Sequence, residues 1–255
     1  MQLQNKVAFI TGTGSGIGKA AAVLFAKQGA KIALISDDEK EVNDTAREIG
    51  SSALPISCDV AQADQVESAV KKTIERFGKI DIVYANAGIN GVWAPIEEIS
   101  PREWDHTINI NLRGTYLTIH YTVPHLKKNG GGSILVTSSV NGTRTFSNTG
   151  ATAYSATKAA QLAITQMLAV ELAQFNIRIN CICPGAIDTE ISQNTQKRDL
   201  EKVKLEAKYE RPIPLHNKPG LSQQVADLAL FLASDASSHI TGTPVWIDGA
   251  QSLIR

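Results

Sequence analysis

The sequence has little cysteine, no excess charge of either sign and no cluster of metal-ligating residues. Its three cysteines, Cys58, Cys181 and Cys183, are an odd number without metal-like spacing, which favours free thiols in a reducing compartment. The last two fall on the same face of one strand-like run, where we expect them to be buried apolar filler. The five histidines form no ligand pair with a cysteine or a carboxylate. We therefore predict no metal site.

Long apolar runs are also missing. No uninterrupted apolar stretch approaches the length of a membrane span. A strand-like run begins at residue 7 and leaves no room for a signal peptide ahead of it, so we expect a cytoplasmic protein. The 25 basic and 25 acidic residues cancel, without a basic run of the kind that marks a nucleic-acid or membrane surface. A content of 43% hydrophobic and 20% charged residues is typical of a soluble globular protein.

The sequence shows instead a regular alternation of two patterns. Short apolar runs predict strands at 7–11, 31–36, 53–57, 80–85, 132–138, 177–183 and 244–247. Helical patterns lie between them at about 17–28, 39–49, 62–77, 101–128, 153–175 and 222–233. Strands that alternate with helices join through right-handed crossovers into a parallel sheet with both faces covered. No linker or shift of composition divides residues 1–255, so we predict a single α/β domain.

A glycine-rich loop follows the first predicted strand and opens the first predicted helix. Gly12, Gly16 and Gly18 follow Thr11 in a T-G-x-x-x-G-x-G pattern. Glycines allow a tight turn and let backbone N–H groups approach a pyrophosphate, which the helix N-terminus also favours. A glycine cluster alone is also consistent with a flexible turn, but its position after the first strand favours a dinucleotide site.

Small and polar residues follow several other predicted strands. The carboxyl ends of parallel strands form the edge where open α/β sheets bind ligands, so we expect these residues around one site. The segments are Asp59-Val60, Asn86-Ala87-Gly88, Ser138-Ser139 and Pro184-Gly185, the last followed by Ile187 and Thr189. Asn111 lies instead inside a predicted helix, where its poor helix propensity indicates a local kink or a water-binding role.

Tyr154 and Lys158 are four residues apart in a predicted helix and therefore share one face. At a separation of ~4 Å and an effective dielectric near 20, an ammonium favours a phenolate by ~4 kcal/mol. That would lower the pKa of the phenol by up to about 3 units, close to neutrality. The pair alone is more typical of an ordinary helix surface, and only the rest of the chain favours chemistry.

Taken in order, these segments resemble the short-chain dehydrogenase/reductases, in their single-domain branch. The resemblance covers nearly the whole chain and includes its closing segments at 240–242 and 247–249. Each motif is weak alone, but all of them occur in the family's order. The resemblance implies a doubly wound, Rossmann-type sheet of seven strands. It also implies the NAD(P)-dependent interconversion of an alcohol and a carbonyl.

Carried over residue by residue, the resemblance assigns four catalytic residues. Tyr154 is the general acid/base that takes the hydroxyl proton as hydride leaves for the nicotinamide, and Lys158 binds the nicotinamide ribose and lowers the pKa of Tyr154. Ser139 polarises the reacting oxygen; we prefer it to the serine before it because the three residues that follow resemble those after the family's catalytic serine. Asn111 positions a water that links Lys158 to solvent. An alkoxide-like oxygen needs such fixed donors and a base tuned near the working pH.

The resemblance also implies which residues hold the dinucleotide. They come from the glycine-rich loop, the strand ends and the Tyr-Lys pair. The predicted set is Gly12, Ser15, Gly16, Ile17, Gly18, Asp37, Asp59, Val60, Asn86, Ala87, Gly88, Tyr154, Lys158, Pro184, Gly185, Ile187 and Thr189.

An acidic segment after the second predicted strand favours NAD over NADP. Asp37 is nineteen residues beyond Gly18, about where an acid binds the adenosine ribose hydroxyls. A 2′-phosphate there would also meet the two acidic residues that follow, and Ser15 offers it no positive charge. In NAD-preferring relatives the acid usually stands where Ser36 does, one residue earlier. The alternative is that the acidic run only begins the next helix, where carboxylates are favoured.

The substrate is expected to be a small secondary alcohol or ketone. Two alternatives are an NADPH-dependent 3-oxoacyl-thioester reductase and a non-catalytic dinucleotide-binding protein. The intact catalytic residues argue against the second alternative, and the acid at Asp37 argues against the first. Trp93, Phe146 and Ile191 are candidate apolar walls of the substrate site.

Two further expectations concern the outside of the domain. By resemblance, the segment at about 187–217 forms a substrate lid, and its charged residues are typical of a solvated helical face. The predicted helix at 153–174 is apolar nearly all round, which favours burial on a second side. Resemblance assigns that side to another subunit, packed with the helix that carries Leu112, Tyr116, Leu117 and Ile119, in a homo-oligomer that we expect to be a tetramer.

Overall fold

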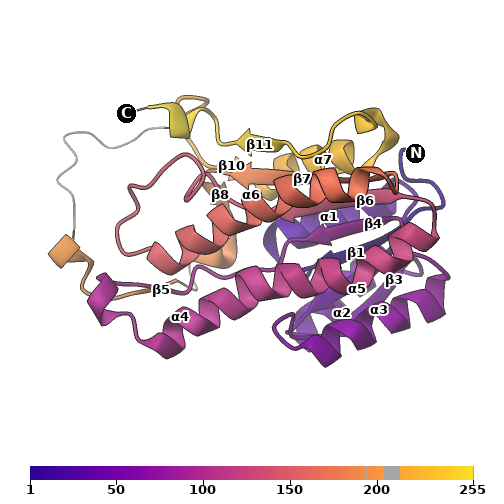
Figure 1. Cartoon of the computed structure of the whole chain (residues 1–255), viewed down its shortest axis with the longest axis horizontal. Helices are drawn as coiled ribbons and strands as arrows, with labels where there is room; N and C mark the ends of the chain where they lie inside the picture. The colour runs from indigo at the N-terminus through magenta and orange to yellow at the C-terminus, as the bar shows by residue number, and fades with distance from the viewer. Residues whose placement is uncertain (193–194, 204–212, 255) are drawn as a thin grey trace.

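The computed structural model describes residues 1–192, 195–203 and 213–254. Its centre is a parallel sheet of seven strands in the order β11-β7-β6-β4-β1-β2-β3 (Figure 1), which confirms the predicted fold class. The strands are β1 (Val7–Thr11), β2 (Lys31–Ser36), β3 (Ala53–Ser57), β4 (Ile82–Ala85), β6 (Gly132–Thr137), β7 (Ile177–Pro184) and β11 (Pro244–Ile247). The strand order reverses between β1 and β4, and this is the point where sheets of this kind bind ligands.

Helices cover both faces of the sheet. One face carries α1 (Gly16–Lys27), α2 (Glu39–Ile49) and α7 (Ser222–Ala233). The other carries α3 (Ala63–Phe77), α5 (Gly114–Lys128) and α6 (Thr152–Ala173), of which α5 and α6 lie toward the viewer in Figure 1. None of these described helices is both long and apolar enough to cross a membrane.

The strands are apolar on both sides because each side faces a helical layer. Phe9 packs into the core under α3, α5 and α6, and Ile10, its neighbour in β1, packs into the core under α1, α2 and α7. Val83 and Tyr84 of β4 also pack on opposite faces of the sheet, Val83 in the first of these cores and Tyr84 in the second. All five residues of β1 are buried. The unbroken apolar runs of the sequence follow from this two-sided burial.

The predicted helical segment at 101–128 is confirmed, but its hydrogen-bond pattern changes in the middle. The chain forms α4 (Pro101–Ile108), a π-helical turn at Asn109–Arg113, and then α5. Asn111 lies in this turn and is fully buried. Its backbone carbonyl accepts hydrogen bonds from Gln161 Nε2 at 2.9 Å and Thr115 Oγ1 at 2.7 Å. The local kink expected at this asparagine is therefore a π turn.

The segment predicted as a lid is attached to the body where it is described. β8 (Ile187–Asp188) pairs with β10 (Gly220–Leu221), and β9 (Gln196–Lys197) pairs with β5 (Val92–Trp93). The Arg198 guanidinium forms an ion pair with the Glu103 carboxylate at 3.0 Å. A short 3₁₀ helix follows at Leu200–Val203, and the remainder of the expected lid helix lies outside the described residues.

Candidate active site

A cavity of about 400 Å³ opens at the carboxyl ends of β1, β4, β6 and β7. All of the predicted cofactor-binding residues line it except Gly18, and Ser139 lines it as well. Residues from eight segments of the chain thus meet at one place, as the rule for parallel strand ends requires. Of the expected apolar walls, Ile191 lines the cavity, whereas Trp93 and Phe146 do not.

The glycine-rich loop fits a dinucleotide. Gly12 and Gly16 have φ angles of 71° and 53°, which favour glycine. A Cβ on Gly12 would lie 2.9 Å from the Cα of Ala87, and a Cβ on Gly18 would lie 2.0 Å from the Gly12 carbonyl oxygen. Gly18 therefore allows α1 to approach the loop from behind. No side chain caps α1 at Ser15, which leaves the N–H groups of its first turn for an anionic ligand.

Hydrogen bonds join the loop to the neighbouring strand ends. Thr11 Oγ1 accepts the N–H groups of Asn86 and Ala87, both at 3.0 Å. The Asn86 side chain donates from Nδ2 to the Thr11 carbonyl at 3.1 Å and accepts at Oδ1 from Thr137 Oγ1 at 2.9 Å. Asn86 thus connects β1, β4 and β6 and fixes one wall of the cavity.

Tyr154 and Lys158 stand one turn apart at the start of α6 and both line the cavity. The Tyr154 phenol interacts with the Ser139 hydroxyl, and this interaction favours the ionised phenol. Ser139 Oγ also accepts the Asn141 N–H at 3.1 Å and makes only a long hydrogen bond, of 3.5 Å, to the Pro184 carbonyl. Ser138 also lines the cavity, but its hydroxyl donates to the Lys158 carbonyl at 2.6 Å and is held by the backbone of α6. This arrangement favours Ser139, rather than Ser138, as the partner of a reacting oxygen.

The Lys158 ammonium is almost fully buried, and its Nζ donates to the Thr137 carbonyl at 2.8 Å. Burial lowers the pKa of Lys158 to about 8. Burial also raises the pKa of the Tyr154 phenol, and the interaction with Ser139 opposes this only in part. The expectation that Lys158 brings the phenol close to neutrality is wrong in this structure. Lys158 Nζ lies 5.4 Å from the Tyr154 ring centroid, and desolvation dominates both groups.

Asn111 lies behind the cavity rather than in its lining. Its Oδ1 accepts the Ile89 N–H at 2.8 Å, and its Nδ2 donates to the Ile89 carbonyl at 2.9 Å. A Cβ on Gly88 would lie 3.2 Å from Asn111 Oδ1 and 3.5 Å from Lys158 Nζ. Asn111 therefore holds the chain just after the Asn86-Ala87-Gly88 segment, and its predicted role in positioning a water stays a prediction.

Several lining residues were missed from the sequence. The most informative are Ser36, Glu41 and Glu190, which share one end of the cavity with Asp37. Glu41 stands in the first turn of α2. The helix dipole favours carboxylates at that position, so a glutamate there gave no indication of a binding role. Cys58, Ile89, Asn90, Ile110 and Thr137 complete the set that sequence reasoning left out, together with Gly14.

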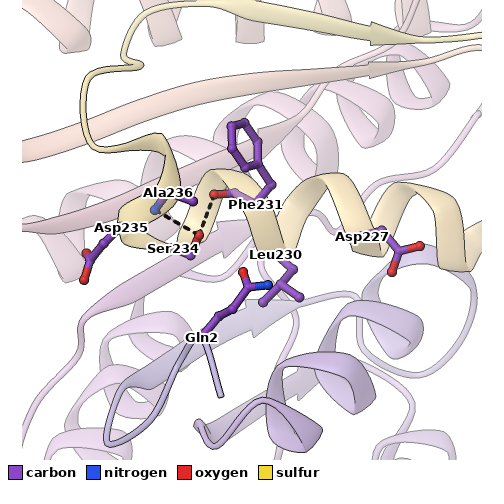
Figure 2. Close-up of a pocket in the computed structure, with 7 residues that line it drawn as sticks. All are labelled: Gln2, Asp227, Leu230, Phe231, Ser234, Asp235 and Ala236. Carbon is purple, nitrogen blue, oxygen red and sulfur yellow. Dashed lines mark hydrogen bonds between the residues drawn. The ribbon is translucent and has the colours of Figure 1, made fainter.

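A second hollow, of about 350 Å³, lies at the last turns of α7 (Figure 2). Gln2, which lines it, precedes the first residue of β1, so this hollow is at the amino edge of the sheet, away from the cavity described above. The Ser234 hydroxyl accepts the Ala236 N–H at 3.3 Å and donates to the Phe231 carbonyl at 3.0 Å. The Ser234 hydroxyl therefore serves to end α7, and none of the predicted site residues lines this hollow.

Residues 12–250 match the family model described as Enoyl-(Acyl carrier protein) reductase. The 3-ketoacyl-ACP reductase of Sinorhizobium meliloti 1021 is 51% identical with a TM-score of 0.94, over 98% of this chain and 100% of that one. The 3-ketoacyl-(acyl-carrier-protein) reductase of Brucella melitensis, complexed with NADH, is 33% identical with a TM-score of 0.89, over 98% and 99%. The levodione reductase of Leifsonia aquatica is 35% identical over 97% of this chain and 94% of its own length.

The sheet, the loop and the Ser-Tyr-Lys group define a nicotinamide-dependent oxidoreductase that transfers a hydride between its cofactor and a secondary alcohol or ketone. The chain belongs to the short-chain dehydrogenase/reductase family, which confirms the resemblance found in its sequence.

Replacing Lys158 with methionine is expected to stabilise the fold at neutral pH. The pKa of Lys158 falls from 10.5 to about 8 on folding, so below pH 8 the folded state holds a buried ammonium at a cost of up to ~3 kcal/mol. The lost bond to the Thr137 carbonyl offsets about 1 kcal/mol of the gain. Between pH 8 and 10.5 the folded state binds fewer protons than the unfolded chain, so the cost disappears as pH rises through that window.

Urea unfolding of the two proteins at pH 7 and pH 10 measures this difference. We expect the variant to be the more stable at pH 7, with most of its advantage lost at pH 10. An advantage of equal size at both pH values would show that packing, and not the ammonium, separates the two proteins.

Proposed function

We propose that the protein is an NAD-dependent dehydrogenase/reductase of small secondary alcohols and ketones. The observation that carries the proposal is the placement of the Tyr154 phenol, the Ser139 hydroxyl and the buried Lys158 in one cavity, whose glycine-rich loop fits a dinucleotide. In the alcohol-to-ketone direction, the substrate loses a hydride to the nicotinamide and its hydroxyl proton to the protein. The bound nicotinamide supplies only the hydride chemistry, and every proton must be handled by the chain.

Each of the three side chains has one task in this proposal. Tyr154 takes the hydroxyl proton, and in the reverse direction it donates a proton to the carbonyl oxygen. Ser139 donates a hydrogen bond to the same oxygen and stabilises the charge that develops there. Lys158, fixed by the Thr137 carbonyl, places a cation in the same cavity; its attraction for a phenolate opposes the desolvation of Tyr154 but does not outweigh it. A phenol whose pKa is raised by burial depends on such help to act as a base.

The charge of the cavity supports NAD rather than NADP. Lys158 is the one basic residue among the described residues that line it, and it lies at the Tyr154 end. At the β2 end the described lining contributes the carboxylates of Asp37, Glu41 and Glu190. A 2′-phosphate bound there would meet like charge, and the described lining offers it no arginine or lysine. Lys19, whose charge reaches Glu41 from outside the lining, is paired with Glu48 at 3.3 Å. The relative from Brucella melitensis, whose structure contains NADH, gives independent support.

The Tyr154→Phe variant is expected to lose turnover and keep cofactor binding, because the phenol is needed only for proton transfer. Ser139→Ala is expected to lower kcat by at least ~10²-fold, as the loss of one oxyanion donor does. Steady-state kinetics and NADH fluorescence titration measure the two effects separately. Tyr121→Phe, at a tyrosine of α5 that packs against the core and does not line the cavity, is the matched control and should behave as wild type. Near-normal turnover by Tyr154→Phe would overturn the assigned chemistry.

A second candidate activity is the reduction of 3-oxoacyl thioesters. It is favoured by the 51% identity with the Sinorhizobium meliloti 3-ketoacyl-ACP reductase. We expect kcat/KM to be higher with NADH than with NADPH, and higher for small cyclic or aliphatic ketones than for an acetoacetyl thioester. Both ratios come from one panel of the two cofactors and the two substrate classes. Preference for NADPH together with the thioester would establish the second activity instead.

We also propose that the protein assembles through α5 and α6 into a symmetric homo-oligomer, a tetramer as the resemblance implies. Tyr116 of α5 is 52% exposed, and Met167 and Val170 of α6 are 73% and 83% exposed. Leu117 and Ile119 of α5 are buried in the core under the sheet and are not part of this surface. The remaining large apolar side chains are what a partner surface would cover.

Val170→Glu is expected to convert the oligomer to a smaller species, because a carboxylate would be buried without a partner. Light scattering at micromolar concentration measures the change of mass. Ile96→Glu makes the same change of chemistry at an apolar residue that is 59% exposed and outside α5 and α6, and it should leave the mass unchanged. A wild-type protein that is already monomeric would refute the proposed assembly.

A further inference from the structure

At the β2 end of the cavity, the more buried carboxylate is not the one that the sequence favours. Asp37 and Glu41 both line the cavity, but Asp37 is exposed, whereas Glu41 is partly buried. Glu41 Oε2 lies 2.2 Å from the point that a Cβ of Gly14 would occupy, and Ser36 Oγ lies 3.1 Å from the same point. The Glu41 carboxylate and the Ser36 hydroxyl therefore flank the glycine-rich loop from one side.

The first turn of α2 explains why Glu41 points there. Asp38 is the N-cap, and its side chain accepts the Glu41 N–H at 2.9 Å. Glu41 is thus the third helical residue, and side chains in a helix tilt toward its N-terminus. That direction leads back to the glycine-rich loop. The close approach is available because residue 14 is glycine, and any side chain there would meet the Glu41 carboxylate.

The Glu41 carboxylate is poised to accept hydrogen bonds. Among the described residues no donor is hydrogen-bonded to it, since its one recorded hydrogen bond is made by its backbone N–H. Partial burial raises its pKa, the charges of Asp38, Glu190 and Asp37 act in the same direction, and the charge of Lys19 opposes them only in part. A carboxylate in these surroundings is stabilised by neutral hydroxyl donors and destabilised by a second anion.

We propose that Glu41 is the residue that selects the cofactor, by accepting hydrogen bonds from the ribose hydroxyls of the adenosine half and repelling a 2′-phosphate. The carboxylate reaches this place from the first turn of α2 instead of from the end of β2, where Ser36 carries only a hydroxyl. Asp37, which is exposed, has a minor part. This inference rests on the proposed preference for NAD and assigns that preference to one side chain.

The test measures cofactor binding, independently of turnover. Dissociation constants for NADH and NADPH are determined by fluorescence titration for wild type, Glu41→Gln and Asp37→Asn, with circular dichroism as the check that each variant folds. The two variants remove one negative charge each from the same end of the cavity and are matched controls for one another. In wild type we expect NADH to bind at least tenfold more tightly than NADPH. Glu41→Gln should lower that ratio at least tenfold, and Asp37→Asn should change it less than twofold.

The outcomes separate the two proposals. If wild type prefers NADH but Asp37→Asn lowers the ratio as much as Glu41→Gln or more, the role of Glu41 is refuted and the NAD preference stands. If wild type shows no preference for NADH and Glu41→Gln still improves NADPH binding tenfold, the proposed preference is refuted and the role of Glu41 stands. If Glu41→Gln leaves the ratio within twofold of wild type, Glu41 does not select the cofactor, whatever wild type prefers.

Discussion

The hydrogen bonds of Asn86 join the strand ends around which the rest of the site is built. The strand order reverses between β1 and β4, so the chain after β1 and the chain after β4 turn to opposite sides of the sheet and leave a crevice. Asn86 closes the base of this crevice through Thr11 on β1 and Thr137 on β6. The Thr137 backbone carbonyl in turn accepts a hydrogen bond from the Lys158 ammonium, so the glycine-rich loop and α6 share one anchor.

Burial of polar groups is the constraint that determines how the two ionisable groups near this anchor behave. Lys158 lies in an apolar surrounding that opposes its charge, and the Tyr154 phenol lies in one that opposes ionisation. Both groups are therefore sensitive to any hydrogen bond or charge that reaches them, and each has few such partners in the protein. A site of this kind lowers the stability of the fold in order to hold reactive groups in place, as is common where function and stability conflict.

The sequence predicts most of the fold because burial on both faces of the sheet leaves a strong signal. Apolar runs such as that of β1 predicted the seven strands. The rule that ligands bind at the carboxyl ends of parallel strands predicted which strand-end residues would meet, and those residues line the cavity. The π turn at Asn109–Arg113 and the direction of Glu41 were not predictable in this way. Both depend on partners distant in sequence, Gln161 for the turn and Gly14 for the carboxylate. The raised pKa of Tyr154 was also not predicted, because the helical spacing of Tyr154 and Lys158 does not show how deeply either side chain is buried.

Helix α6 connects the chemistry to the proposed assembly. Its first turns carry Tyr154 and Lys158, and its later turns expose Met167 and Val170. An α-helix of 22 residues transmits a displacement at one end to the other, since its backbone hydrogen bonds resist bending. Gln161, midway along it, is also bonded to the π turn behind the cavity. A partner packed on the exposed half would therefore restrain the position of the phenol and of the ammonium, so the proposed assembly and the chemistry would be coupled through α6.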